Sequence, residues 1–226
     1  MRPENPETII VKNEFYPSGL TENDVWNYYQ KNKSFIIKES FPRDVMLAIM
    51  VKQNEYILKR KTSDGKFLQL TNSTYDTLMH GRTITVYNIM KFYESFGIID
   101  IDFDQFDVCK QAAADVYDSI LEAPFTNKAH IKFTGKEGFH IICEFKRKGK
   151  IDAIRFLLKN HLSRDMRLKK YTIEQKRTSK TPNLDLSPNK LNGAYIATHS
   201  LSVIGLKCEI INYNDLSSFN PRQSKI

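Results

Sequence analysis

The chain of 226 residues carries 34 Lys and Arg against 26 Asp and Glu, a formal net charge of +8. A hydrophobic content of 41% and a charged content of 27% exclude a disordered tail, a collagen-like repeat and a coiled coil, and the length allows one large or two small domains. No apolar run approaches the roughly 20 residues that cross a bilayer, and no signal-peptide pattern follows Met1. Three widely spaced cysteines predict neither disulfides nor a zinc cluster. We therefore expect an intracellular, cytoplasmic protein with no membrane partner.

The charge is unevenly distributed along the chain. Residues 146–180 contain 13 Lys and Arg and 3 Asp and Glu, whereas residues 94–122 contain 8 acids and one base. An acidic segment beside a basic one suits a site that holds metal ions and also grips phosphates. The alternative is that both segments are simply solvated helix faces.

The first part of the chain is predicted to be rich in strands. Thr21 followed by Asp24 has the pattern of a capping box and predicts a helix that continues to about Lys33. A Ser-Asp-Gly turn at 63–65 is expected between two strands. In chain order, we expect strands at 7–12, 34–39, 45–52, 55–60, 66–70 and 82–87, and then a short helix at 88–96.

The second part alternates strands with two longer helices. Apolar residues recur at helical spacing over 105–121 and 151–161. Strands are expected at 98–103, 129–133, 139–145, 194–198 and 207–211. Together the elements predict an α+β protein with one compact domain over 1–226, made of two modules at about 1–95 and 96–226.

Asp100 and Asp102 end a strongly apolar segment. On a strand, positions two apart face the same side at a separation of roughly 6.6 Å, so both carboxylates project together while Ile99, Ile101 and Phe103 face the core. Paired carboxylates suit hard divalent cations. A solvated acidic pair at a sheet edge is the alternative, and Asp104 leaves the register open.

Two further motifs follow in the sequence. Thr134-Gly135-Lys136-Glu-Gly-Phe-His140 places two glycines, a hydroxyl, a positive charge and an imidazole between two strands, which suits an anion held by backbone N–H groups. Asp185 stands between two leucines and is expected to be a carboxylate on a strand. An ordinary hairpin and a turn aspartate are the alternatives when each motif is taken alone.

The order of these motifs resembles the archaeo-eukaryotic primase superfamily. Asp100 and Asp102 resemble its metal-binding DxD, residues 134–140 resemble its Ser-Gly-x-x-Gly-x-His phosphate motif with Thr for Ser, and Asp185 resembles its third metal-binding aspartate. The segment Phe15-Tyr-Pro-Ser-Gly-Leu-Thr21 resembles the start of the polymerase domain of bacterial ligase D. The resemblance runs in patches from about residue 9 to 210, and it implies two apposed β-rich modules with the active-site cleft between them.

The resemblance implies a template-directed nucleotidyltransferase, a DNA primase or primase-polymerase that adds nucleotides to a 3′-hydroxyl and releases pyrophosphate. Asp100, Asp102 and Asp185 would hold two divalent metal ions, Mg²⁺ or Mn²⁺. Single-stranded or gapped DNA and nucleoside triphosphates are the implied substrates, and a primase large subunit, a helicase or a ligase the implied protein partners, at the nucleoid or a replication site. The implied triphosphate ligands are Thr134, Gly135, Lys136 and His140, with Arg177 or Arg60, and the basic residues Lys146, Arg147 and Lys148 would hold template backbone.

The chain departs from the family pattern at several positions. Ser202 stands where ligase D domains carry Arg and primases His, and Asn13 and Glu22 fall where ligase D domains carry the lysines that recognise a 5′-phosphate. No zinc motif separates the catalytic motifs. Three alternatives therefore remain open: a ligase D-type gap-filling repair polymerase, a haloacid-dehalogenase-like phosphatase, and a non-catalytic nucleic-acid-binding module.

Overall fold

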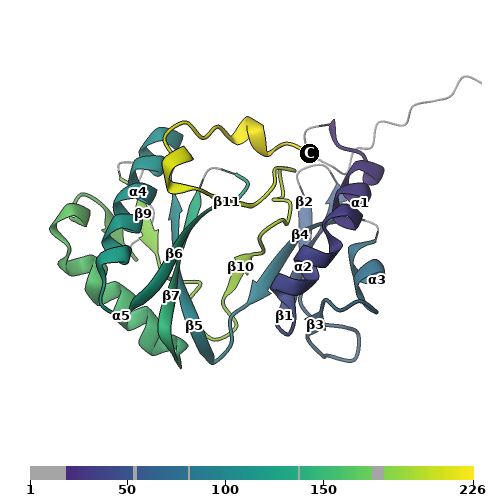
Figure 1. Ribbon diagram of the computed structural model, residues 1–226. Helices are drawn as coiled ribbons and strands as arrows, with labels where there is room; N and C mark the ends of the chain where they lie inside the picture. Colours follow the sequence, from purple (N-terminus) through teal and green to yellow (C-terminus); the bar gives the residue numbers. More distant parts are fainter. Residues whose placement is uncertain (1–18, 53–54, 81, 137, 175–180) are drawn as a thin grey trace, which may run out of the picture.

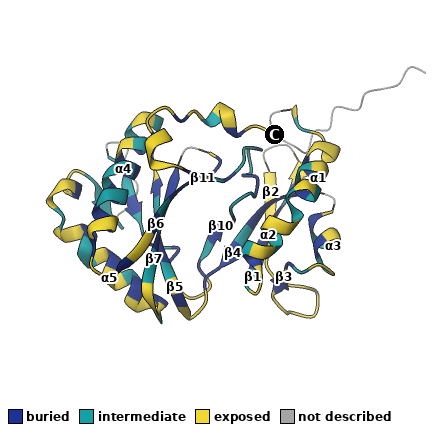
Figure 2. Cartoon of the chain, in the orientation of Figure 1, coloured by how far each residue is buried: buried dark blue, intermediate teal, exposed yellow. Residues whose placement is uncertain are grey.

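The computed structural model describes residues 19–52, 55–80, 82–136, 138–174 and 181–226. These residues form two β-sheets that face each other, and helices cover the outer face of each sheet (Figure 1). Most strands are largely buried, whereas β2 and the outward sides of the helices are exposed (Figure 2). No helix in the described ranges is long and apolar enough to span a lipid bilayer.

The first sheet has five strands in the order β10-β4-β1-β2, and β3 also pairs with β1. Helices α1, α2 and α3 pack on its outer face, where Val25 and Tyr29 of α1 meet Leu47 and Val86 of the sheet in one buried cluster. The elements are α1 (Glu22–Lys31), α2 (Lys33–Ser40), β1 (Asp44–Lys52), β2 (Glu55–Lys59), β3 (Leu68–Gln69), α3 (Tyr75–Met79), β4 (Thr83–Ile89) and β10 (Ala194–Ile196).

The second sheet has six strands in the order β11-β6-β7-β5-β9-β8. All its pairs are antiparallel except β8 with β9. Helices α4 and α5 cover its outer face and share its core with Ile99, Ile141 and Phe133. The elements are β5 (Tyr93–Asp102), α4 (Phe106–Glu122), β6 (Thr126–Phe133), β7 (Phe139–Lys150), α5 (Ile151–Arg164), β8 (Thr172–Ile173), β9 (Asn183–Asp185) and β11 (Glu209–Ile211).

The capping box predicted at the start of the first helix is confirmed. Thr21 N donates to Asp24 Oδ2 over 2.8 Å, and Asp24 N donates to Thr21 Oγ1 over 3.2 Å, so two of the free N–H groups at the helix start are satisfied. Helix α1 ends at Lys31, close to the predicted end. The strand expected at 7–12 lies outside the described residues.

The strand expected at 34–39 is wrong, because these residues form helix α2. Ile36 and Ser40 are its buried residues, one turn apart on a single face, whereas Phe35 is exposed. A short apolar run of this kind fits a strand or a helix equally well from its pattern, and packing against the first sheet decides.

The short helix expected at 88–96 is also wrong. Strand β4 continues to Ile89, and β5 begins at Tyr93 after a tight connection. Glu94 explains the connection: its Oε1 accepts from Lys91 N over 2.7 Å, and its carboxylate pairs with the Arg43 guanidinium over 2.5 and 2.8 Å. This buried, bidentate pair fixes an extended chain where propensity alone favours a helix.

The chain crosses between the sheets more than once. It passes from β4 to β5, and it later returns from the second sheet to the first, where Ala194–Ile196 pair with β4 as strand β10. The two modules expected at about 1–95 and 96–226 therefore interleave at β10. This return places Tyr195 and Ile196 at the space between the sheets.

Candidate active site

A cavity between the two sheets collects the residues of the sequence motifs. It has a volume of about 330 Å³ and receives residues from both sheets. Asp100 and Asp102 of β5 line it together with Thr134, Lys136 and His140 of the glycine-containing turn. From the opposite side, it is lined by Tyr56 of β2, Tyr87 of β4, Tyr195 and Ile196 of β10, and Ser202.

Four polar residues form a row across the second sheet, called here the polar row. His140 of β7 lies directly opposite Lys132 of β6 on one side and Asp100 of β5 on the other. Asp100 in turn lies directly opposite Asp185 of β9. Because directly opposed residues project to the same face of a sheet, all four side chains share the face on which Asp100 and His140 line the cavity.

The electrostatic environment of Asp100 disfavours the negative charge of its carboxylate. Burial, then the repulsion of Asp102 and of Asp185, raise the pKa of the Asp100 carboxyl from 3.8 to about 7, and Lys132 opposes this rise. Burial, followed by the charge of Lys132, holds the pKa of His140 well below its usual value, so the imidazole is neutral. Its Nε2 lies 3.4 Å from Asp100 Oδ1, and its buried Nδ1 has no hydrogen-bond partner among the described residues.

The raised pKa of Asp100 predicts a pH-dependent gain in stability for Asp100→Asn. Folded Asp100 retains a proton that the unfolded chain releases between about pH 3.8 and pH 7, so its ionisation costs the fold stability as the pH rises through this window. Without divalent cations, Asp100→Asn should melt at a higher temperature than the wild type near pH 8. The difference should vanish toward pH 4 when calorimetry is run in EDTA. A variant that melts lower than the wild type at pH 8 would contradict the strained-carboxylate interpretation.

The turn after β6 requires glycine at two positions. Gly135 has φ of +82°, and a Cβ placed there would lie 2.7 Å from Leu206 O. At Gly138 a Cβ would lie 2.5 Å from Ile101 O, between the two aspartates of β5. Thr134 closes the turn, because its N and its Oγ1 both donate to Gly138 O, over 3.1 and 3.0 Å. The turn is therefore packed against β5 and against the segment that contains Ser202.

Ser202 holds this turn instead of contributing a positive charge. Its Oγ donates to Gly135 O over 2.5 Å, and the residue is buried at the cavity wall. Cys208 Sγ donates to Thr134 O over 2.9 Å from the same side. Ser202, at the position where the resemblance leads to Arg or His, thus braces the glycine-containing turn of this chain.

Sequence reasoning missed Lys132 and the tyrosines of the cavity. The Lys132 side chain is fully buried, its Nζ donates to Ile196 O, and it lies 5.2 Å from the centre of the Tyr195 ring. Alternation along β6 places Lys132 on the face opposite Ile131 and Phe133, which by itself indicates a solvated lysine. Only the first sheet, which lies opposite, buries it. Tyr56 and Tyr87 were likewise indistinguishable from core aromatics.

Comparison with known proteins supports this architecture. No protein-family model and no curated protein sequence matches the chain. Among solved structures, the polymerase domain of Mycobacterium tuberculosis ligase D, determined in complex with DNA, matches with a TM-score of 0.73 at 12% identity, over 93% of this chain and 88% of that one. The fold is that of the ligase D polymerase domain. The predicted α+β architecture and the resemblance to the primase superfamily are confirmed for the fold, whereas the chemistry must be argued from the site.

The ligase D polymerase fold implies divalent metal ions, and the acids of this chain supply suitable oxygen donors. Asp185 Oδ1 and Oδ2 accept from Ser187 N and Ser187 Oγ over 2.7 and 2.6 Å, and no three His, Cys, Asp or Glu side chains in the described ranges converge as a ready metal site. The mutual repulsion of Asp100, Asp102 and Asp185 is nevertheless what a cation would relieve. The chemistry of the donors fits, and ligation by Asp185 would exchange its contacts with Ser187 for the cation.

The basic residues expected to bind phosphates lie at different distances from the cavity. Arg60 Nε lies 3.1 Å from Met46 Sδ, and Met46 pairs with Tyr87, which lines the cavity. Arg60 is therefore on the cleft side of the first sheet. Two strand spacings separate it from Tyr87, a distance of roughly 10 Å. Lys136 lines the cavity itself. Arg177 lies outside the described residues.

Two acids of the acidic segment pair with residues of the basic segment. Arg167 of the basic segment pairs with Glu122 over 2.7 Å, and Lys170 pairs with Asp115 over 2.7 Å, both acids lying on α4. Glu94 forms an ion pair with Arg43. The acidic segment is therefore not one metal-binding surface, and only its Asp100 and Asp102 line the cavity.

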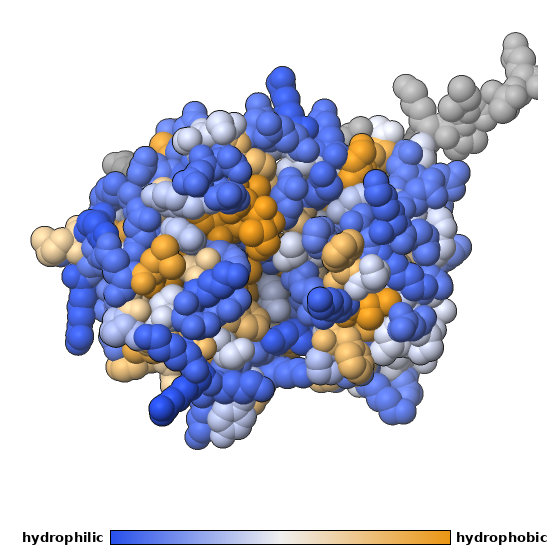
Figure 3. All heavy atoms as spheres, in the orientation of Figure 1, coloured by the Kyte–Doolittle hydropathy of each residue, from blue (hydrophilic) through white to orange (hydrophobic). Residues whose placement is uncertain are grey.

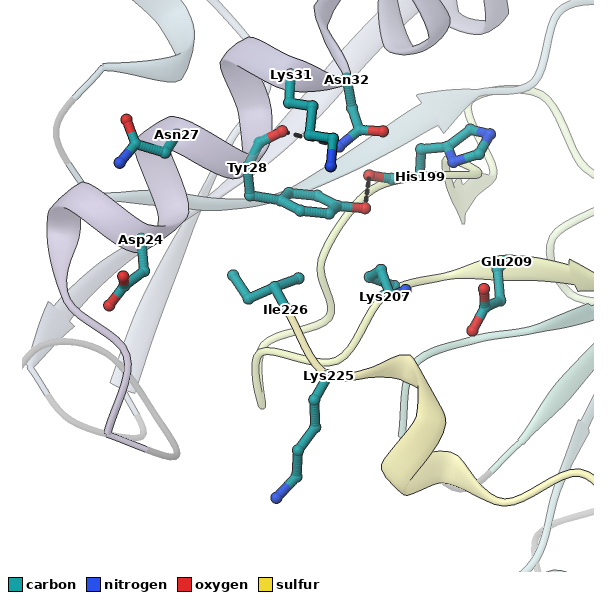
Figure 4. A pocket seen from close by; sticks show the side chains of 10 residues that line it. All are labelled: Asp24, Asn27, Tyr28, Lys31, Asn32, His199, Lys207, Glu209, Lys225 and Ile226. Carbon is teal, nitrogen blue, oxygen red and sulfur yellow. Dashed lines mark hydrogen bonds between the residues drawn. The ribbon is translucent and has the colours of Figure 1, made fainter.

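A larger cavity lies elsewhere, between α1 and the loop that contains His199 (Figure 4). Its volume is about 590 Å³, and Tyr28 Oη donates to His199 O at its edge over 2.9 Å. Both lysines and acids line it, and none of the residues predicted to be functional does. The lining residues are Asp24, Asn27, Tyr28, Lys31, Asn32, His199, Lys207, Glu209, Lys225 and Ile226. Size alone therefore does not identify the site, and the inter-sheet cavity carries the chemistry.

Proposed function

We propose that this chain is a template-directed nucleotidyltransferase, a primase-polymerase catalytic core that extends a nucleic-acid 3′-hydroxyl and releases pyrophosphate. The observation that carries the proposal is the meeting of the DxD pair and the phosphate-motif turn at one cavity between the two sheets. The likeness to a DNA-bound polymerase domain supports the same interpretation. On the face shown in Figure 3, hydrophilic side chains surround most of the hollow between the two halves and apolar ones lie at one margin, and this hollow is the proposed path of the nucleic acid.

The residues that line the cavity have different roles in the proposed reaction. Asp100, Asp102 and Asp185 would hold the divalent cations, which when bound neutralise charge on the α-phosphate and lower the pKa of the attacking hydroxyl. Lys136 and the N–H groups of the turn face the anionic phosphates. His140, neutral and linked to Asp100, orients that carboxylate and offers an uncharged nitrogen to the phosphate side. Tyr56 and Tyr87 present aromatic rings to the nucleoside.

The deciding experiment is extension of a defined template by the wild-type protein. Primed and unprimed single-stranded templates are incubated with each of the eight nucleotides in turn, with Mg²⁺ or Mn²⁺. Products longer than the primer support the proposal, and products without a primer assign a primase. No incorporation under any condition, together with no binding of metal and nucleoside triphosphate in calorimetry, supports the non-catalytic nucleic-acid-binding alternative.

A ligase D-type gap-filling polymerase is the second candidate, because the matched structure is such a domain. Glu22, which opens α1, carries a negative charge where the resemblance leads to a phosphate-binding lysine. Asn13, the other such position, lies outside the described residues. Gapped substrates with and without a 5′-phosphate separate the candidates, because only a gap-filling enzyme should prefer the phosphorylated gap. The dehalogenase-like alternative is excluded by the fold.

Lys146, Arg147 and Lys148 are predicted to hold template backbone, and all three are exposed on the distal part of β7. They lie six to eight residues beyond His140, roughly 20 Å or more along the strand. Replacing the three with alanine should weaken DNA binding similarly across sequences. The slope of log affinity against log salt should fall by about 2 to 3 units, because each lost phosphate contact removes about 0.7 to 0.9. Fluorescence anisotropy across a salt series measures this, and an unchanged slope moves the template surface elsewhere.

A further inference from the structure

Lys132 occupies an environment that a lysine enters at a cost. Its side chain is fully buried, and among the described residues the hydrogen-bond partner of its ammonium is the carbonyl of Ile196 and not a carboxylate. Burial lowers the pKa of the amine, while the carboxylates of Glu39 and Asp100 oppose that shift. Burying an ammonium without a directly paired carboxylate is unfavourable, and an apolar side chain of the same length would fill the space without this penalty. A role at the site would explain the lysine.

The ammonium of Lys132 joins the two sheets beside the cavity. The residue belongs to β6 of the second sheet, whereas Ile196 and Tyr195, which its Nζ contacts, belong to β10 of the first sheet. Both of these partners line the inter-sheet cavity, but Lys132 does not. The lysine therefore acts on the cavity through the strand that it holds.

The same ammonium is the positive end of the polar row. His140 separates it from Asp100, and two strand spacings place Lys132 and Asp100 roughly 10 Å apart at the backbone. A cation held by Asp100 and Asp102 would have the same sign as Lys132. Lys132 is fully buried and the Asp100 side chain is one-third exposed, so water screens the repulsion between two like charges at this range only in part.

We propose that Lys132 is a positioning residue whose buried ammonium fixes β10 against the polar row and weakens the binding of a free divalent cation at Asp100 and Asp102. The inference rests on the proposed function of the site. As a consequence, the acids alone bind a cation with low affinity, and the phosphates of the nucleotide complete the cation's ligand shell.

The test compares Lys132→Met, which keeps the length and removes both the charge and the donor, with Lys132→Arg, which keeps both. Titration calorimetry with Mn²⁺ alone should show about 10-fold tighter binding to Lys132→Met than to the wild type. Lys132→Arg should stay within about 3-fold of the wild type. In extension assays, kcat of Lys132→Met should fall at least about 10-fold, while KM for the nucleotide changes less than about 3-fold, because the lysine does not line the cavity.

Thermal melting identifies a variant that fails to fold. If Lys132→Met does not fold, Lys132→Gln takes its place, because it also removes the charge but keeps a hydrogen-bond donor. Lys132→Gln should bind Mn²⁺ as tightly as expected for Lys132→Met. Wild-type Mn²⁺ affinity and kcat in folded, uncharged variants overturn the inference, since a purely structural lysine would not alter cation affinity. The wild type separates the two levels: Mn²⁺ binding without extension overturns the proposed function and leaves the affinity ratio to decide on Lys132. Absence of Mn²⁺ binding from both the wild type and Lys132→Met overturns the inference, while extension by the wild type still decides the proposed function on its own.

Discussion

Replacing Asp100 or Asp102 with alanine is expected to abolish metal-dependent extension of a primed template. Both carboxylates line the inter-sheet cavity beside His140 and Lys136, and Asp100 is the acid whose charge the site most strongly disfavours. Loss of one preorganised group at a reacting centre commonly costs 10²- to 10³-fold, and loss of a metal ligand should cost about 10³-fold or more. Single-turnover extension with Mg²⁺ and with Mn²⁺ measures this loss.

The matched control is Asp104→Ala, two residues beyond the pair and outside the cavity lining. This variant removes one carboxylate from the same segment and should retain nearly all activity. DNA binding, measured by anisotropy, should stay close to that of the wild type in all three variants, because the template is held by basic residues. Thermal melting in EDTA near pH 8 should show no loss of stability in Asp100→Ala beyond the few contacts of its side chain, since the lost charge was itself unfavourable. Full activity in either Asp100→Ala or Asp102→Ala would remove these residues from the catalytic centre.

Local patterns sufficed for the fold where one face of an element is clearly apolar. The strand predicted at 98–103 from alternation forms the second half of β5, and the helix predicted at 105–121 from helical spacing is α4. The segments at 34–39 and 88–96 were not, because their structure depends on partners far away in the sequence. Ile36 turns toward the first sheet, and Glu94 is held by Arg43, which lies 51 residues earlier. No local pattern contains that information.

The candidate site was also only partly predictable from the sequence. The order of the DxD pair, the glycine turn and Asp185 is visible in the sequence, and the register places Asp100 opposite both His140 and Asp185. Lys132 was missed because its burial depends on β10, a strand that begins 62 residues later and belongs to the other sheet. The charge segments misled for a related reason: Asp115 and Glu122 are paired with basic residues of the other segment, which charge counting along the chain does not reveal.

A methyl group added at Gly138 should disable the site without removing any chemical group from it. The Cβ of Gly138→Ala would lie 2.5 Å from Ile101 O and 3.5 Å from Asp102 Cα, and backbone atoms cannot give way as a flexible side chain can. The start of β7 must then move away from β5 at the level of the DxD pair. We expect a loss of about 1 to 3 kcal/mol in the free energy of unfolding, and a fall in kcat of about 10²-fold or more from the displaced carboxylates and imidazole.

Gly149→Ala, near the far end of β7, provides the matched control. Its Cβ would lie 3.5 Å from Ile154 Cγ1, an ordinary contact with a movable side chain, so stability should change by less than about 1 kcal/mol. Chemical denaturation and single-turnover extension measure the two effects separately. If Gly138→Ala is destabilised but still extends primers at the wild-type rate below its melting temperature, the packing of the turn against β5 serves the fold alone. If instead kcat falls while the fold persists, the close approach of Gly138 to Ile101 O is what aligns the phosphate-motif turn with the acids of β5.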